Sequence, residues 1–193
     1  MRRFDWIGAM IVFLVIGCSG KEGIPTYPYN PPRTGEAGVK EVLLIRAASG
    51  DLIDAQSIDG KVPFQISVAN VAAPLEKQPW HSQAKSALDA LVRGKRAWIQ
   101  VYETLEVPDG PQIEVALVHV DGRDVSWELV GHGNAWVWET KNNDPELTKL
   151  QTWARERKKG LWSLPDSDRE PPWEYIDRIM RERMQGRERA APN

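Results

Sequence analysis

Apolar and polar residues alternate with a period of two in the first part of the chain, which is typical of strands with one wet face. Polar residues separate Phe64, Ile66 and Val68, and turn residues at 49–51 and 59–61 bound the apolar stretch before them. Strands are therefore expected at 42–45, 52–57 and 64–68. Short turns join these segments, so the pattern predicts an antiparallel meander that opens a small barrel.

The apolar period becomes helical after Pro74. Ala84, Leu88 and Val92 recur at helical spacing, and Gly94 ends a helix that starts near Trp80. Further strands are expected at 98–102, 113–118 and 135–138, and helices at 125–129 and at 145–159, where Gly160 stops the second helix. Five barrel strands with a helix between the third and the fourth are the order of an OB-fold. We therefore predict an α+β, mainly β fold: a five-stranded OB-fold barrel with about three packed helices.

The chain after Pro165 is polar until Pro171-Pro172-Trp173, and an apolar stripe at helical spacing follows. The stripe consists of Ile176, Ile179, Met180 and Met184, interspersed with arginines and acidic residues. This pattern predicts a C-terminal amphipathic helix over 174–189. A solvated helix, docking on the barrel, a partner and anionic lipid all remain open as its role.

The N-terminus combines a short basic start with an apolar run from Ile7 to Ile16. A run of about ten residues is too short for a bilayer, which needs roughly twenty. Val15-Ile16-Gly17-Cys18 resembles the lipobox of a bacterial lipoprotein signal, and Ser19 resembles the residue that follows in lipoproteins sent to the outer membrane. We expect an exported chain that is lipid-anchored to a membrane through Cys18, the outer one in a two-membrane bacterium; an ordinary secretory signal and an uncleaved anchor are the alternatives.

Four segments follow from these patterns. They are a lipoprotein signal peptide at 1–17, a tether rich in Pro and Gly at 18–38, a barrel domain at 39–165, and a polar linker with the terminal helix at 166–193. Tyr27 and Tyr29 within the tether leave a proline-rich recognition peptide as an alternative to a spacer.

Composition limits the classes of function. The formal net charge is −2, with 25 basic and 27 acidic side chains, so no overall basic excess favours binding to a polyanion. The single cysteine excludes an internal disulfide. The three histidines are scattered without the close pairing of a zinc site.

Several spaced motifs carry a resemblance to a known family. They are Gly50-Asp51, Ala73-Pro74, the phrase from Leu129 to Val137, Ala154-Arg155, Gly160-Leu161-Trp162 and Pro172-Trp173-Glu174. Over roughly residues 39 to 175 the chain resembles a staphylococcal nuclease domain. The resemblance implies an OB-fold and a calcium-dependent endonuclease acting on DNA or RNA.

The same resemblance identifies the positions of the family's catalytic charges. Asp51 keeps the place of one calcium ligand. The places of the phosphate-clamping arginine, the second calcium ligand, the proposed base and the second arginine are taken by Ser67, Ala72, Leu75 and Ile113. Glu76, one residue late, is a candidate substitute for the base, and a solvent-facing Glu76-Lys77 pair is the alternative. Each lost charge donor costs about 10²- to 10³-fold in rate.

Two hypotheses follow. In the first, the domain is catalytically degenerate, needs no cofactor, and binds a protein or polymer ligand in the cell envelope. In the second, it is a divergent exported nuclease that uses calcium at Asp51, with Glu76 and with Arg46 or Arg123 as borrowed groups. Nucleic acid stays a possible ligand, because Trp136 and Trp138, two apart on one strand, are expected to share a face on which bases stack. The alternative for most tryptophans is core packing.

Overall fold

A computed structural model describes residues 23–27, 35–108, 110–138 and 144–190, with the side chains of 186–190 left aside. The predicted signal, Cys18 and Tyr29 lie outside the described residues. Within the described ranges, none of the helices combines the length and the apolar character needed to cross a bilayer.

The barrel is a curved sheet whose strand order is β3-β2-β1-β5-β6-β7. Its strands are β1 (Val39–Ala47), β2 (Leu52–Ser57), β3 (Pro63–Val68), β5 (Arg96–Leu105), β6 (Ile113–Val120) and the short β7 (Arg123–Asp124). Neighbours are antiparallel, and a parallel pairing of β3 with β6 closes the barrel. A separate two-stranded sheet pairs β4 (Val71–Ala72) with β8 (Trp136–Val137). The predicted OB-fold barrel is confirmed.

Alternation along the strands builds the core. Five different strands each contribute a fully buried residue: Leu44, Ile53, Ile66, Ile99 and Val118. Each of these residues has a more exposed neighbour on at least one side in the sequence. Burial of a side chain of this size contributes about 1.5–3 kcal/mol, so the period-two pattern is itself the main source of the fold's stability.

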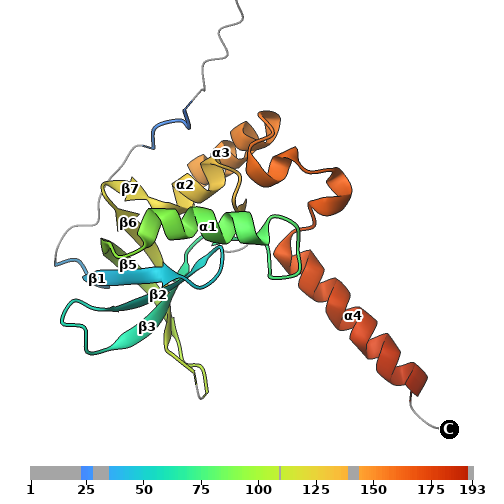
Figure 1. The fold of residues 1–193 in the computed structure, drawn as a ribbon, viewed down its shortest axis with the longest axis horizontal. Coiled ribbons are helices and arrows are strands. Elements are labelled where there is room, and N and C mark those ends of the chain that lie inside the picture. Colours follow the sequence, from blue (N-terminus) through green and yellow to red (C-terminus); the bar gives the residue numbers. More distant parts are fainter. Residues whose placement is uncertain (1–22, 28–34, 109, 139–143, 191–193) are drawn as a thin grey trace, which may run out of the picture.

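Three helices gather on one side of the barrel, and a fourth runs away from it (Figure 1). They are α1 (His81–Val92), α2 (Val125–Gly131), α3 (Pro145–Glu156) and α4 (Pro172–Ala190). Aspartates begin two of them: Asp124 accepts the N–H of Trp127 at the start of α2, and Asp144 accepts that of Glu146 at the start of α3. The predicted helices, including the terminal one, are confirmed to within a few residues.

Two local predictions are wrong. The helix expected to reach Gly160 ends at Glu156, because Lys158 and Gly160 both adopt left-handed backbone with φ of 50°. The strand expected at 135–138 ends at Val137. Trp136 is 6% exposed and packs edge-on against Trp162, whereas Trp138 is 39% exposed. The two tryptophans therefore differ in environment, although the backbone pairing continues to Trp138, whose N–H donates to the Asn70 carbonyl oxygen at 2.9 Å.

Candidate functional site

Asp51 lies in the turn between β1 and β2, and we call residues 49–52 the Asp51 turn. The Ser49 hydroxyl donates to one carboxylate oxygen at 2.7 Å, and the Ala73 N–H donates to the other at 2.9 Å. Burial raises the pKa of Asp51, although these two hydrogen bonds oppose the rise. Both oxygens already have partners, so this carboxylate ties the turn to the loop before Pro74.

Close packing surrounds the turn. Gly50 is buried, and a Cβ on it would lie 2.5 Å from the Ala73 Cβ and 2.9 Å from the Ala84 Cβ. Only glycine lets the turn approach both the loop and α1 this closely. The space beside Gly50, directly before Asp51, is therefore filled by methyl groups.

The other positions expected to carry charge lie nearby and are neutral. Ser67 pairs in register with Val115, and Ile113 at the start of β6 pairs with Gln65. Ala72 is 7% exposed and pairs with Trp136. No group of three or more His, Cys, Asp or Glu side chains in the described part of the chain is placed to hold a metal ion.

The arginines considered as substitutes are engaged elsewhere. Arg46 pairs with Asp54 at 2.8 Å, and Arg123 lies 4.0 Å from Glu128. His81 is the residue whose electrostatic interaction lowers the pKa of Asp51, and its Nδ1 lies 2.8 Å from the Pro74 carbonyl oxygen. Neither Arg46 nor Arg123 pairs with Asp51.

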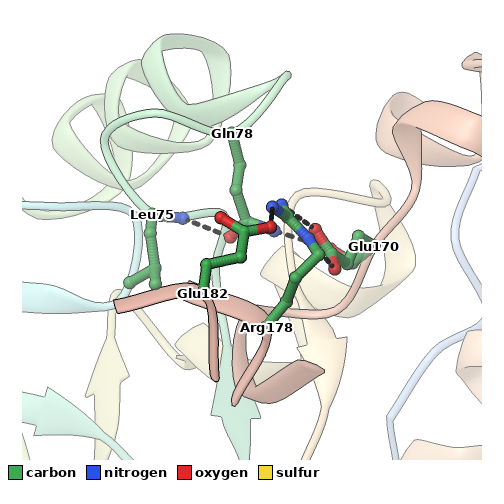
Figure 2. Close-up of polar contacts among 5 residues, drawn as sticks. All are labelled: Leu75, Gln78, Glu170, Arg178 and Glu182. Carbon is green, nitrogen blue, oxygen red and sulfur yellow. Dashed lines mark hydrogen bonds and ion pairs between the residues drawn. The ribbon is translucent and has the colours of Figure 1, made fainter. Parts of the chain in front are cut away.

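Leu75, at the position of the family's proposed base, lies in a loop that the C-terminal segment holds (Figure 2). Its N–H donates to the Gln78 side chain at 2.9 Å, and Gln78 donates to the Glu170 carbonyl oxygen at 2.7 Å. Arg178 on α4 makes a two-pronged ion pair with Glu170 at 2.9 and 2.8 Å. Glu76 is exposed on this loop, beside α4.

A pocket of about 660 Å³ lies next to the Asp51 turn, and we call it the acidic pocket. Its walls come from β3, β5, β6, α2 and the start of α3. The lining residues are Tyr27, Ser67, Val68, Ala69, Asn70, Tyr102, Glu103, Leu105, Val115, Leu117, Asp124, Ser126, Trp127, Trp138, Asp144 and Leu147. Ser67, which the family resemblance aligns with the phosphate-clamping arginine, thus lies in this wall.

The segment 23–27 forms one wall of the acidic pocket by docking on α2. The Trp127 indole N–H donates to the Pro25 carbonyl oxygen at 2.8 Å. The ring centroids of Tyr27 and Trp127 are 4.6 Å apart, and the Tyr27 hydroxyl donates to Asp144 at 3.2 Å. This part of the predicted tether therefore packs on the domain.

The electrostatic character of the acidic pocket is negative. Burial and the carboxylates of Asp144 and Asp124 raise the pKa of Tyr27 to about 12. Burial and Asp124 also raise the pKa of Tyr102. Burial lowers the pKa of His119, so a neutral imidazole lies beside Asp124. The described lining contains neither Lys nor Arg, so this surface repels a phosphate backbone.

Sequence reasoning found part of this arrangement. Trp138 was a predicted binding residue and lines the acidic pocket, whereas Trp136 is core. Tyr102, Glu103 and Trp127 were missed. A signal was available only for Tyr27, an aromatic residue in a segment otherwise rich in Pro and Gly.

Comparisons with known proteins agree with the geometry of the barrel. The sequence model of a family described as "Staphylococcal nuclease homologue" matches residues 65–164. An Escherichia coli protein named "Uncharacterized endonuclease" is 33% identical over 130 residues, which is 67% of this chain and 80% of that protein. A probable staphylococcal-like nuclease of Oryza sativa subsp. japonica is 30% identical over 112 residues, 58% of this chain and 32% of that protein.

Proposed function

Because the chain belongs to the staphylococcal nuclease homologue family, we propose that it keeps the family's barrel as a binding module and no longer hydrolyses phosphodiester bonds. One observation carries the proposal: both Asp51 oxygens accept hydrogen bonds from the protein's own Ser49 and Ala73. A calcium ion needs several oxygen ligands. In the described part of the chain, Asp51 belongs to no group of three or more His, Cys, Asp or Glu side chains placed to hold a metal ion.

The loss of charge around the phosphate supports the same proposal. Phosphoryl transfer depends on cations and guanidinium groups that stabilise the transition state. Ser67 and Ile113 carry no charge, and Arg46 and Arg123 face other carboxylates. With two donors missing at about 10²- to 10³-fold each, the expected rate falls by roughly 10⁴-fold or more.

The test is a nuclease assay on the purified full chain. Single-stranded DNA and RNA are incubated with and without calcium, next to an Asp51→Ala variant prepared identically. We expect no cleavage above that of the variant and no calcium-dependent shift in melting temperature. Cleavage that requires calcium and disappears in Asp51→Ala would refute the proposal.

The proposal includes a membrane tether at Cys18, which rests on the lipobox resemblance alone. Lipidation needs the cysteine thiol, so Cys18→Ser should remove incorporation of a labelled fatty acid and shift the protein from the membrane to the soluble fraction. Label that persists in Cys18→Ser would exclude this anchor.

A second candidate is a divergent exported calcium-dependent nuclease. The names of the relatives favour it, since the Escherichia coli protein is called an endonuclease. Such an enzyme needs a base, and Glu76 is exposed on the loop beside α4. The nuclease assay separates the two candidates, and a Glu76→Gln variant then tests whether this residue contributes.

A further inference from the structure

We propose that the acidic pocket binds an organic cation, an ammonium or guanidinium group seated between its carboxylates and aromatic rings. This inference deepens the proposed binding function and rests on it. The pocket's volume of about 660 Å³ lies within the roughly 300–1,000 Å³ that small-molecule sites occupy.

The charge of the lining selects the sign of the ligand. Glu103 on β5 is exposed and forms no ion pair with another described residue. Asp124 accepts the Trp127 N–H at 2.9 Å, and burial raises the pKa of its carboxyl, so it contributes less charge than Glu103. Burial lowers the pKa of its neighbour His119. The carboxyl groups of Glu103, Asp124 and Asp144 thus line the pocket, and its described lining contains neither Lys nor Arg.

The aromatic rings select an organic cation over a simple ion. Tyr27, Tyr102, Trp127 and Trp138 all line the pocket. Tyr102 is 58% exposed and Trp138 is 39% exposed, which is unusual for side chains that could pack in a core. Ring faces attract ammonium and guanidinium groups, and attract them more where water is excluded. A bare metal ion would want several oxygen ligands instead.

Docking of segment 23–27 completes the pocket. Tyr27 contributes a ring that lies against Trp127 and a hydroxyl bonded to Asp144. This wall fixes the Tyr27 ring before any ligand arrives, so less conformational entropy is lost on binding.

Two probes test the proposal by titration calorimetry on the full chain in a maltoside detergent, which carries no cationic headgroup. Tetramethylammonium represents a free organic cation, and a tetra-arginine peptide with blocked ends represents a polypeptide side chain. A tetra-glutamate peptide and sodium chloride at equal ionic strength are the controls. Saturable binding of either cation supports the proposal, and the tighter probe identifies the source. Absence of saturable binding by both overturns it.

Matched variants locate the site. Trp138→Leu should weaken binding about 3- to 10-fold through the lost ring face. Trp98→Leu, which alters a ring of similar exposure (36%) outside the pocket lining, should change it less than about 2-fold. Glu103→Gln should weaken binding about 2- to 5-fold, and the exposed Glu106→Gln outside the lining should not. Equal losses within each pair would overturn the assignment.

The nuclease assay on the same preparations keeps the two proposals apart. If neither cation binds and no cleavage occurs, the pocket assignment fails while the binding module stands. If calcium-dependent cleavage is lost in Asp51→Ala, the proposed function fails whatever the cations do.

Discussion

The Asp51 turn and the acidic pocket are neighbours on the barrel, yet their carboxylates are used in opposite ways. The Val68 N–H donates to the Asp51 carbonyl oxygen at 2.9 Å, and Val68 also lines the pocket. In the turn, both oxygens of a partly buried carboxylate accept hydrogen bonds from the protein. In the pocket, Glu103 is exposed and the rings of Tyr102 and Trp138 face solvent.

Alignment with a catalytic position of the family therefore does not by itself decide the role of a residue. A buried carboxylate that is satisfied by hydrogen bonds from the protein contributes to folding. A carboxylate left among exposed rings keeps its charge available to a ligand. We therefore expect changes in the turn to alter stability, and changes in the pocket to alter binding.

The largest effect is expected from Gly50→Ala. The added methyl would lie 2.5 Å from the Ala73 Cβ, in a region with no room to yield. Overpacking of this kind costs up to about 3 kcal/mol in the free energy of unfolding, to be measured by urea denaturation. Gly23→Ala, where a Cβ has nothing within 4 Å, is the control and should be nearly neutral. An equally neutral Gly50→Ala would mean that the turn is not tightly packed.

Asp51→Ala should lower the free energy of unfolding by about 2 kcal/mol, because the Ala73 N–H loses its partner in a buried place. Asp59→Ala is the matched control: Asp59 also accepts a serine hydroxyl and a backbone N–H in a turn, but it is exposed. We expect Asp59→Ala to cost clearly less unfolding free energy than Asp51→Ala, because water replaces the lost partner. Equal costs for the two variants would contradict a structural role specific to Asp51.

The pH dependence of stability tests the same carboxylate. Burial raises the folded-state pKa of Asp51 above 3.8, so the folded state holds a proton that the unfolded state releases. The contribution of Asp51 to stability is therefore greatest below pH 3.8 and declines as pH rises through the raised folded-state value. Relative to Asp51→Asn, the wild-type chain should lose unfolding free energy as the pH rises from 3.8 through the raised folded-state pKa of Asp51. A slope of opposite sign would indicate that Asp51 faces a cation, as a nuclease requires.

The smallest effect is expected from Arg178→Ala on α4. Its ion pair with Glu170 is only partly shielded from water, so the loss in unfolding free energy should be small. Hydrogen exchange should rise in α4 and in the loop around Leu75, which Gln78 and Glu170 connect. Arg181→Ala is the control, since this exposed arginine bonds only to the Asp177 carbonyl oxygen on its own helix. Unchanged exchange at Leu75 would show that α4 does not support this loop.

The strands and helices were predictable because their signals are local. Phe64, Ile66 and Val68 show their common face within five positions, and Gly94 ends α1 with a left-handed φ of 69°. Where the local signal competes with packing, prediction failed. Trp136 and Trp138 are two apart and were expected in one environment, but Trp162 packs on the first, whereas the second is 39% exposed and lines the acidic pocket.

For the candidate site, the sequence shows only which charged residues of the family are replaced, namely by Ser67, Leu75 and Ile113. The periodicity of apolar residues and the spaced motifs were enough to predict the barrel and its family, because each motif is a short, local stretch of sequence. Closure of the fold alone brought Tyr27 to Trp127 and Asp144, and Ala73 to Asp51. Contacts between residues 22 to 117 positions apart leave no period in the chain, so they follow from how the barrel shuts and which surfaces then remain uncovered.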